Sequence, residues 1–235
     1  MTAQAIHDAQ QEPKPPLTTS LLVREQTYGD AEGKLWTTSQ KSGLSLEEHY
    51  AQGIYPILHN RSEKFPNGES VDDLGRRATQ AINDLVMPHV WSAAREGMKG
   101  AHIAVVSHGL CISEMVPALL RKDHRQIPVG REYRGLRNTG WTRVTIDVEN
   151  LDGSTPLDFS EDSPPPLAVR VTDFNRAEHL DAIKRQQGGI GSAAHDPKQQ
   201  DIRAFFGGAQ LKPTEEVLEG RSASNALDEA EVEIH

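Results

Sequence analysis

The stretch of residues 101–120 places the strongest constraint on how this chain folds. Residues 103–106 form a short apolar, β-branched run, which is typical of a buried strand in a parallel sheet. A polar turn follows at residues 107–109, and an apolar pattern of helical length follows the turn. A strand, a turn and a helix make one βα unit, so we predict an α/β fold whose sheet is mostly parallel.

His108 lies in the turn of this βα unit, where open α/β sheets bind ligands. Its neighbour Gly109 lets a ligand approach the backbone closely, and the following helix N-terminus favours anions. Two interpretations stay open. His108 contributes to a binding or catalytic site, or it only caps the helix or fills a gap.

The chain divides into three parts by composition. Residues 1–20 are rich in Gln, Ala and Pro without periodicity, and we expect a disordered lead-in. Residues 21–185 carry the patterns of a folded domain. Residues 186–235 are rich in Gly, Gln and Ala and show no core pattern, so we expect a largely disordered tail.

Periodicity predicts further elements within residues 21–185. Ser70 is expected to cap a long helix over residues 71–91, whose apolar positions recur at three- and four-residue steps. A shorter helix is predicted within residues 44–59. Alternating β-branched residues predict strands at 138–148 and 167–171, followed by a short helix at 175–180.

Charge and composition exclude several classes of function. The net charge is −9 and no basic stripe stands out, which argues against direct nucleic-acid binding. No apolar run approaches the length of a membrane span. The single cysteine, Cys111, forms no intrachain disulfide and is expected to be a small buried hydrophobe. We therefore expect a cytoplasmic protein, with the nucleus as the alternative compartment.

A histidine after a buried strand, a glutamate in an upstream loop and several arginines form a set that can handle phosphate. Arginine binds phosphate through a two-pronged fork. Glu25 can act as an acid that protonates a leaving alkoxide, and histidine can attack phosphorus or donate to its oxygens. The alternative for Glu25 is a solvated loop carboxylate.

Several stretches, in this order along the chain, resemble the histidine phosphatase superfamily, and more narrowly its phosphoglycerate-mutase-like branch. They are EQTYGDAEG at 25–33, FPNGES at 65–70 with Arg77, VVSHG at 105–109 and NTG at 138–140. The resemblance implies a three-layer α/β/α fold with a mostly parallel sheet. It also implies hydrolysis of a small phosphorylated metabolite through a phosphohistidine, with no metal and no other cofactor.

The resemblance also implies roles for individual residues. Glu25 would be the general acid/base, and His108 would hydrogen-bond the transferred phosphoryl group. Ser107, Gly109 and Leu110 would shape the phosphate pocket through backbone contacts. Glu69 and Arg77 would be structural and would tie the turn at 65–70 to the long helix.

The sequence departs from the family pattern in one respect. No Arg-His-Gly occurs in it, and the family's Ser-x-Leu-x-Arg-Ala stretch is also missing. We therefore expect a domain without its first strand, without the nucleophilic histidine and without two phosphate clamps, and hence poor stability and no phosphatase activity. An N-terminally incomplete phosphatase, a catalytically dead binding module and a non-functional fragment remain open. Substrate identity and the choice between mutase and phosphatase also remain open, as does oligomeric state.

The tail carries a separate motif. Gln199, Ile202, Phe205 and Phe206 fit a pattern that resembles the box with which proteins bind the sliding clamp of DNA replication. In such a box one turn presents the aliphatic and aromatic side chains to an apolar pocket. The alternatives are that the two phenylalanines dock onto the chain's own domain, or that the pattern arose by chance.

Overall fold

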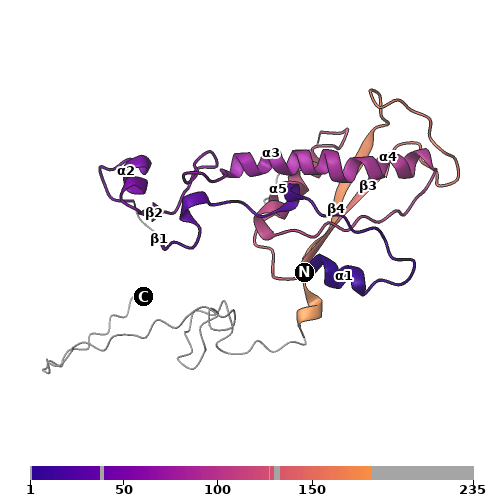
Figure 1. The fold of residues 1–235 in the computed structure, drawn as a ribbon. Helices are drawn as coiled ribbons and strands as arrows, with labels where there is room; N and C mark the ends of the chain where they lie inside the picture. The colour runs from indigo at the N-terminus through magenta and orange to yellow at the C-terminus, as the bar shows by residue number, and fades with distance from the viewer. Residues whose placement is uncertain (1, 38–39, 127, 130–132, 182–235) are drawn as a thin grey trace, which may run out of the picture. The chain divides into compact units, whose positions relative to one another are not determined.

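One long helix runs through the part of the chain that the computed structural model describes, which comprises residues 2–37, 40–126, 128–129 and 133–181. It consists of α3 (Val71–Ala81), a π-helical turn η3 (Ile82–Val86) and α4 (Met87–Arg95), which follow one another without a break (Figure 1). Ser70 caps it, because its hydroxyl accepts from the Asp73 amide while the Asp73 carboxylate accepts from the Ser70 amide, each at 3.0 Å. The predicted helix and its N-cap are confirmed, and the helix continues to Arg95.

The helix α5 (Gly109–Leu120) packs beside α3, as the apolar pattern after the turn predicts. The two helices bury a common core with η3 and α4, in which Leu74, Ile82 and Cys111 are completely inaccessible to solvent. The expectation that Cys111 is a small buried hydrophobe is thus confirmed. Removing such side chains from water is the main favourable contribution to folding.

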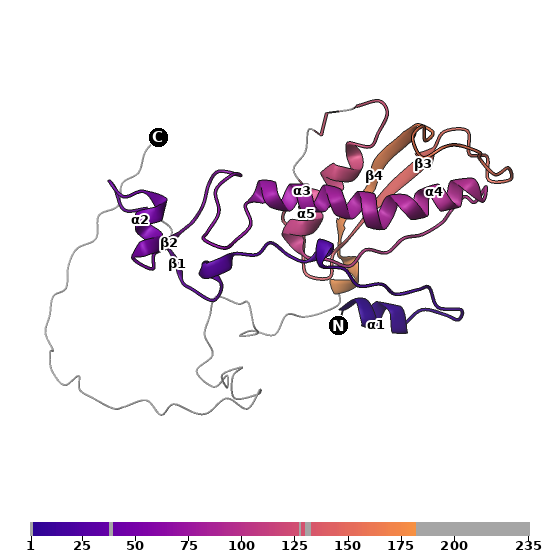
Figure 2. The same cartoon turned by 45° about the horizontal axis from the view of Figure 1, so that its top comes forward.

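Two antiparallel strands complete this core. They are β3 (Trp141–Val148) and β4 (Leu167–Arg176), with Val148 paired to Leu167 and an irregularity between Trp141 and Val144. Figure 2 shows the pair behind the α3–α4 helix, next to α5. Both strands were predicted, and β4 extends five residues further because its pairing with β3 continues to Arg176.

A smaller group of elements follows the N-terminal segment. The strands β1 (Trp36–Thr37) and β2 (Tyr55–Pro56) pair in parallel, and α2 (Leu46–Ala51) lies between them in the sequence. The predicted helix over 44–59 is therefore only six residues long. It ends early because Gly53 adopts a φ of +69°, a left-handed conformation that stops a helix and turns the chain toward β2.

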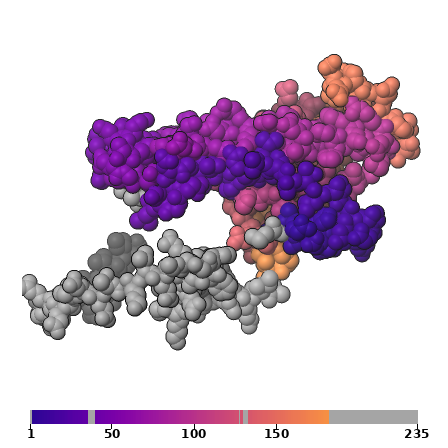
Figure 3. Space-filling view, in the orientation of Figure 1, coloured from indigo at the N-terminus to yellow at the C-terminus, as the bar shows by residue number. Residues whose placement is uncertain are grey.

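The remaining elements are short. The 3₁₀ helices η1 (Leu21–Val23), η2 (Gly29–Ala31) and η4 (Glu178–Leu180) are each three residues long, and η4 stands in the region where a short helix was predicted. Residues 2–20, which we expected to be disordered, include the helix α1 (Thr2–Asp8). An i,i+4 hydrogen bond of 2.8 Å from Gln4 to Asp8 supports it locally. None of its residues is buried, and Figure 3 shows this segment in indigo at the surface.

The strand predicted at residues 103–106 is wrong. The segment is extended, but residues 101–107 form no backbone–backbone hydrogen bond with any part of the described chain. Ile103 and Val105 are 41% and 40% exposed. The sequence pattern is that of a strand, but a strand exists only where a second one pairs with it, and none of the described residues does so.

The described residues therefore combine helices with two two-stranded sheets, one parallel and one antiparallel. The expected three-layer arrangement around a mostly parallel sheet is not formed by them. No described helix has both the length and the apolar character needed to cross a membrane.

We predict that the unpaired segment makes the protein self-associate. An extended apolar segment with free N–H and C=O groups is a template for pairing, and a lysine on it suppresses pairing. Ile103→Lys should weaken self-association several-fold in sedimentation-velocity runs over a concentration series. Ile57→Lys is the matched control, since Ile57 is 37% exposed but lies outside this segment. Equal effects of the two variants would show that the segment has no special part in association.

Candidate active site

The carboxylate of Glu25 lies at the N-terminus of α5. It accepts hydrogen bonds from the backbone amides of Leu110 and Cys111, each at 3.0 Å, and from the amide of Gln26 at 2.9 Å. The first amides of a helix have no partner within the helix and carry its positive dipole end, so a carboxylate is stabilised there. These contacts join Glu25 to two residues that lie 85 and 86 positions further along the sequence.

His108 is the N-cap residue of α5, with extended backbone angles and no capping hydrogen bond from its side chain. His108 thus caps the helix by its position without a hydrogen bond from its ring, and because its side chain is exposed it does not fill a gap. Next to it, Ser107 donates from its hydroxyl to the carbonyl of Val23 at 2.6 Å. Beside Gly109 there is open space, because a Cβ built on it would meet no atom within 4 Å. An exposed imidazole and an unobstructed backbone thus lie directly before the amides that bind the Glu25 carboxylate.

Arg77 holds the loop that carries Glu25. Its side chain is 9% exposed, and its guanidinium donates to both oxygens of Glu69, at 2.8 and 2.7 Å. It also donates to three carbonyls of the loop, those of Leu22 at 3.0 Å, Arg24 at 2.8 Å and Glu25 at 3.1 Å. A planar group with five N–H donors suits this task, and a lysine amine does not.

Glu69 joins the same network from the other side. Its carboxylate also accepts from the Thr27 amide at 3.1 Å and from the guanidinium of Arg24 at 2.9 Å. Burial by itself raises the pKa of the Glu69 carboxyl. The hydrogen bonds from Arg77 and Thr27, with the positive charges of Arg77 and Arg24, outweigh burial and leave this pKa lowered.

The loop at 24–30 and the turn at 65–70 are joined along their backbones. The Glu69 amide donates to the Thr27 carbonyl at 2.7 Å, and the Asp30 amide donates to the Pro66 carbonyl at 3.0 Å. Gly29 makes this approach possible: it has a φ of +54°, and a Cβ on it would lie 2.1 Å from the Pro66 oxygen. The two stretches that resemble family motifs therefore form one structural unit.

Two further titratable groups border the Glu25 carboxylate. Burial raises the pKa of the Tyr28 hydroxyl, and the charges of Glu25 and Glu32 raise it further. Burial is also the largest effect on Cys111 and raises the pKa of its thiol. Both groups stay protonated near neutral pH, so neither supplies an anionic nucleophile.

Among the described residues, no three His, Cys, Asp or Glu side chains are grouped closely enough to hold a metal ion. The structure brings Glu25 together with the segment 107–111, while the catalytic and binding roles of these residues stay predictions. Gln199, Ile202, Phe205 and Phe206 lie outside the described residues, so binding to a sliding clamp also stays a prediction.

Sequence reasoning assigned Glu69 and Arg77 a structural role but missed their contacts with the Glu25 loop. It also missed the Cys111 amide as a donor and Gln26, whose side-chain amide donates to the Glu69 carbonyl at 2.7 Å. One feature of the sequence could have revealed the contacts of Arg77. Arg77 lies on the apolar stripe of its helix, next to Leu74 and Ala78, and a buried guanidinium requires acceptors.

Comparison with known proteins agrees with the motifs. The model of the histidine phosphatase superfamily (branch 1) matches residues 1–152, which is more than half of the chain. The chain belongs to this superfamily, and the α/β character of its fold follows from that membership. No curated protein and no solved structure matches the chain.

We predict that Arg77→Lys lowers the free energy of unfolding by about 2–3 kcal/mol, because lysine leaves buried acceptors without donors. Arg76→Lys is the matched control, since Arg76 is the neighbouring residue, its side chain is 78% exposed, and it pairs at the surface with Asp73. It should change stability by less than about 0.5 kcal/mol. Urea unfolding of both variants measures the difference. Similar losses in the two would contradict the role assigned to Arg77.

We further predict a pH dependence from Glu69. Because its pKa is lowered in the folded protein, its stabilisation is present above its unfolded pKa of about 4.3 and is lost as pH falls below that value. Glu69→Gln should therefore cost most stability near pH 7 and progressively less on acidification below about pH 4. Urea unfolding from pH 7 to acid tests this, with the exposed Glu47→Gln as control. A cost that stays constant over the whole range would contradict it.

Proposed function

We propose that this chain is a phosphatase-like member of its superfamily whose site takes the phosphate of a small phosphorylated metabolite. The observation that carries the proposal is the bonding of the Glu25 carboxylate to the amides of Leu110 and Cys111, directly beside His108. It puts a potential proton donor and an exposed imidazole at a helix N-terminus, which is the part of a helix that attracts phosphate.

In this proposal each group has one task. The phosphate enters the open space beside Gly109, where the backbone leaves room for it. His108 donates a hydrogen bond to a phosphoryl oxygen, and Glu25 exchanges a proton with the bridging oxygen of the ester. Ser107 keeps the turn in place through its bond to the Val23 carbonyl.

We also propose that the polypeptide of residues 1–235 binds phosphate without turning over esters. Its sequence contains no Arg-His-Gly, the motif that would supply the nucleophile and a phosphate-binding arginine. Removing a nucleophile or a charged transition-state donor costs orders of magnitude in rate. The alternative function, a binding module that acts through Gln199, Ile202, Phe205 and Phe206, rests on the sequence motif alone.

Binding is tested by titrating inorganic phosphate and following the backbone amide signals of Gly109, Leu110 and Cys111 by NMR. We expect saturable shifts, with affinity reduced by at least about tenfold in His108→Ala through loss of one hydrogen bond to a charged group. His102→Ala is the matched control, because His102 is exposed and lies in the same loop. If phosphate leaves these signals unmoved, or if both variants bind equally, the phosphate site is refuted.

Turnover is measured in the same samples with phenyl phosphate. We expect the wild-type chain to hydrolyse it no faster than the Glu25→Gln/His108→Ala double variant. Hydrolysis by the wild type that disappears in Glu25→Gln would contradict the inactivity and would show that another residue of this chain supplies the nucleophile.

A further inference from the structure

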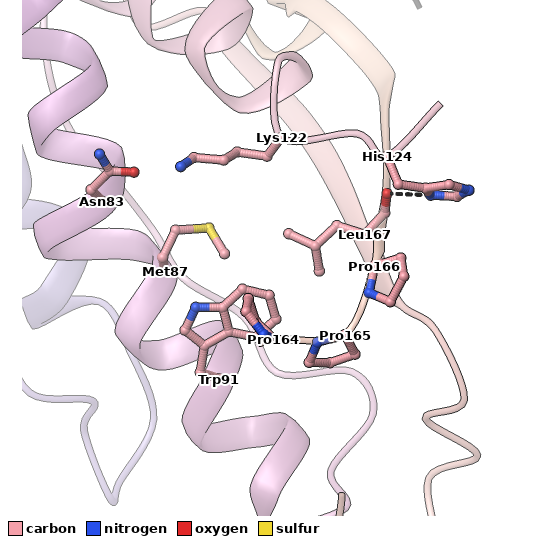
Figure 4. A pocket seen from close by; sticks show the side chains of 9 residues that line it. All are labelled: Asn83, Met87, Trp91, Lys122, His124, Pro164, Pro165, Pro166 and Leu167. Atoms are coloured by element: carbon pink, nitrogen blue, oxygen red, sulfur yellow. Dashed lines mark hydrogen bonds between the residues drawn. The ribbon is translucent and has the colours of Figure 1, made fainter. Parts of the chain in front are cut away.

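A cavity of about 370 Å³ lies between α4 and the start of β4 (Figure 4). Neither Glu25 nor any of residues 107–111 lines it, so it is separate from the candidate active site. Its size falls in the range of pockets that hold small organic molecules. None of the tasks proposed above uses it.

The apolar part of the cavity is formed by packed side chains and prolines. Met87 and Leu167 are each only 5% exposed and form part of the core. Trp91 is held in an edge-to-face contact with Phe159, with ring centroids 5.7 Å apart. The three consecutive prolines 164–166 form another wall, and proline rings have fixed backbone φ angles and no N–H to satisfy. A flat apolar ligand can therefore pack here without reorganising the wall.

The polar part consists mainly of Lys122 and Asn83. Figure 4 shows the Lys122 amine directed toward the side-chain oxygen of Asn83 at one side of the cavity. Neither side chain has a hydrogen-bond or ion-pair partner among the described residues. No Asp or Glu is among the lining residues, so nothing in the wall neutralises the ammonium. An anionic group on a ligand would meet an unpaired positive charge.

The backbone that presents Lys122 is fixed to β4. The neighbouring Asp123 carboxylate accepts from the Val169 amide at 2.7 Å. His124 donates from its backbone amide to the Leu167 carbonyl at 2.9 Å, and its Nδ1 lies 2.8 Å from the same oxygen. These bonds position the start of the Lys122 side chain before any ligand arrives, which lowers the entropic cost of binding.

The wall formed by the long helix begins at a π-helical turn. Asn83 belongs to the π-helical turn η3, and Met87 follows directly after it. A π-helical turn is rare inside an α-helix and occurs mostly at functional sites. It adds a residue to one turn and so changes the direction in which Asn83 projects relative to Met87 and Trp91.

We propose that this cavity binds a small planar organic anion. Its ring would pack against Trp91, Met87 and the prolines, and its carboxylate or similar group would pair with Lys122. The proposal is independent of the phosphate site, with which it shares no residue.

The test compares 2-naphthoate with its neutral analogue 2-naphthamide on the full chain. The NMR signal of the Trp91 indole N–H, assigned with Trp91→Phe, reports binding. We expect saturable binding of naphthoate with a Kd of about 1 mM, given the ligand's size. Naphthamide should bind about three- to tenfold more weakly, because it lacks the charge that pairs with Lys122.

Lys122→Met should abolish this preference, and Lys34→Met, a change at an exposed lysine outside the cavity, should leave it intact. Thermal unfolding confirms that both variants are folded. The proposal is overturned if the Trp91 signal does not respond, if the two ligands bind equally well, or if the preference survives in Lys122→Met.

Discussion

The guanidinium of Arg77 fixes the geometry of the candidate site. It donates five hydrogen bonds, two to the Glu69 carboxylate and three to carbonyls of the loop that carries Glu25. Arg77 belongs to α3, and the Glu25 carboxylate is bonded to the first amides of α5. The packing of α3 against α5 and the path of the loop are therefore mutually dependent. Loosening the guanidinium would displace the Glu25 carboxylate and uncap the helix together.

The capping of α5 by Glu25 has a chemical consequence for a phosphate ligand. The amides of Leu110 and Cys111 are the donors that a helix N-terminus offers to an anion, and Glu25 already uses them. A phosphate at this site has to interact with His108 and the backbone beside Gly109, next to a carboxylate. Two anions this close repel each other, so the interactions of a phosphate with His108 and the backbone would have to outweigh this repulsion.

Local patterns predicted the helices well and the sheet poorly. The apolar steps of residues 71–91, the N-cap Ser70 and the helix after residue 109 depend on neighbours within a few positions, so the sequence contains the necessary information. The paired strands β3 and β4 are close in the sequence and were also found. The segment 103–106 has equally clear strand character, but its pairing depends on a distant partner that no local pattern reveals. The same holds for the carbonyls that Arg77 binds, since the path of residues 22–25 is fixed by contacts more than 50 positions away.

The unpaired segment 101–107 leads directly into His108. The position of this candidate site residue therefore depends on how the segment is held. In a parallel sheet the residue after a strand is positioned by hydrogen bonds on both sides of that strand. Here those bonds are absent from the described residues, and the turn is held by the Ser107 hydroxyl on the Val23 carbonyl and by Glu25 on the amides of α5. The loop of residues 21–25, anchored by Arg77, thus takes over support that a sheet would provide. Any strand that pairs with residues 101–107 would also restrict the position of His108, so association at this edge and the order of the site are physically coupled.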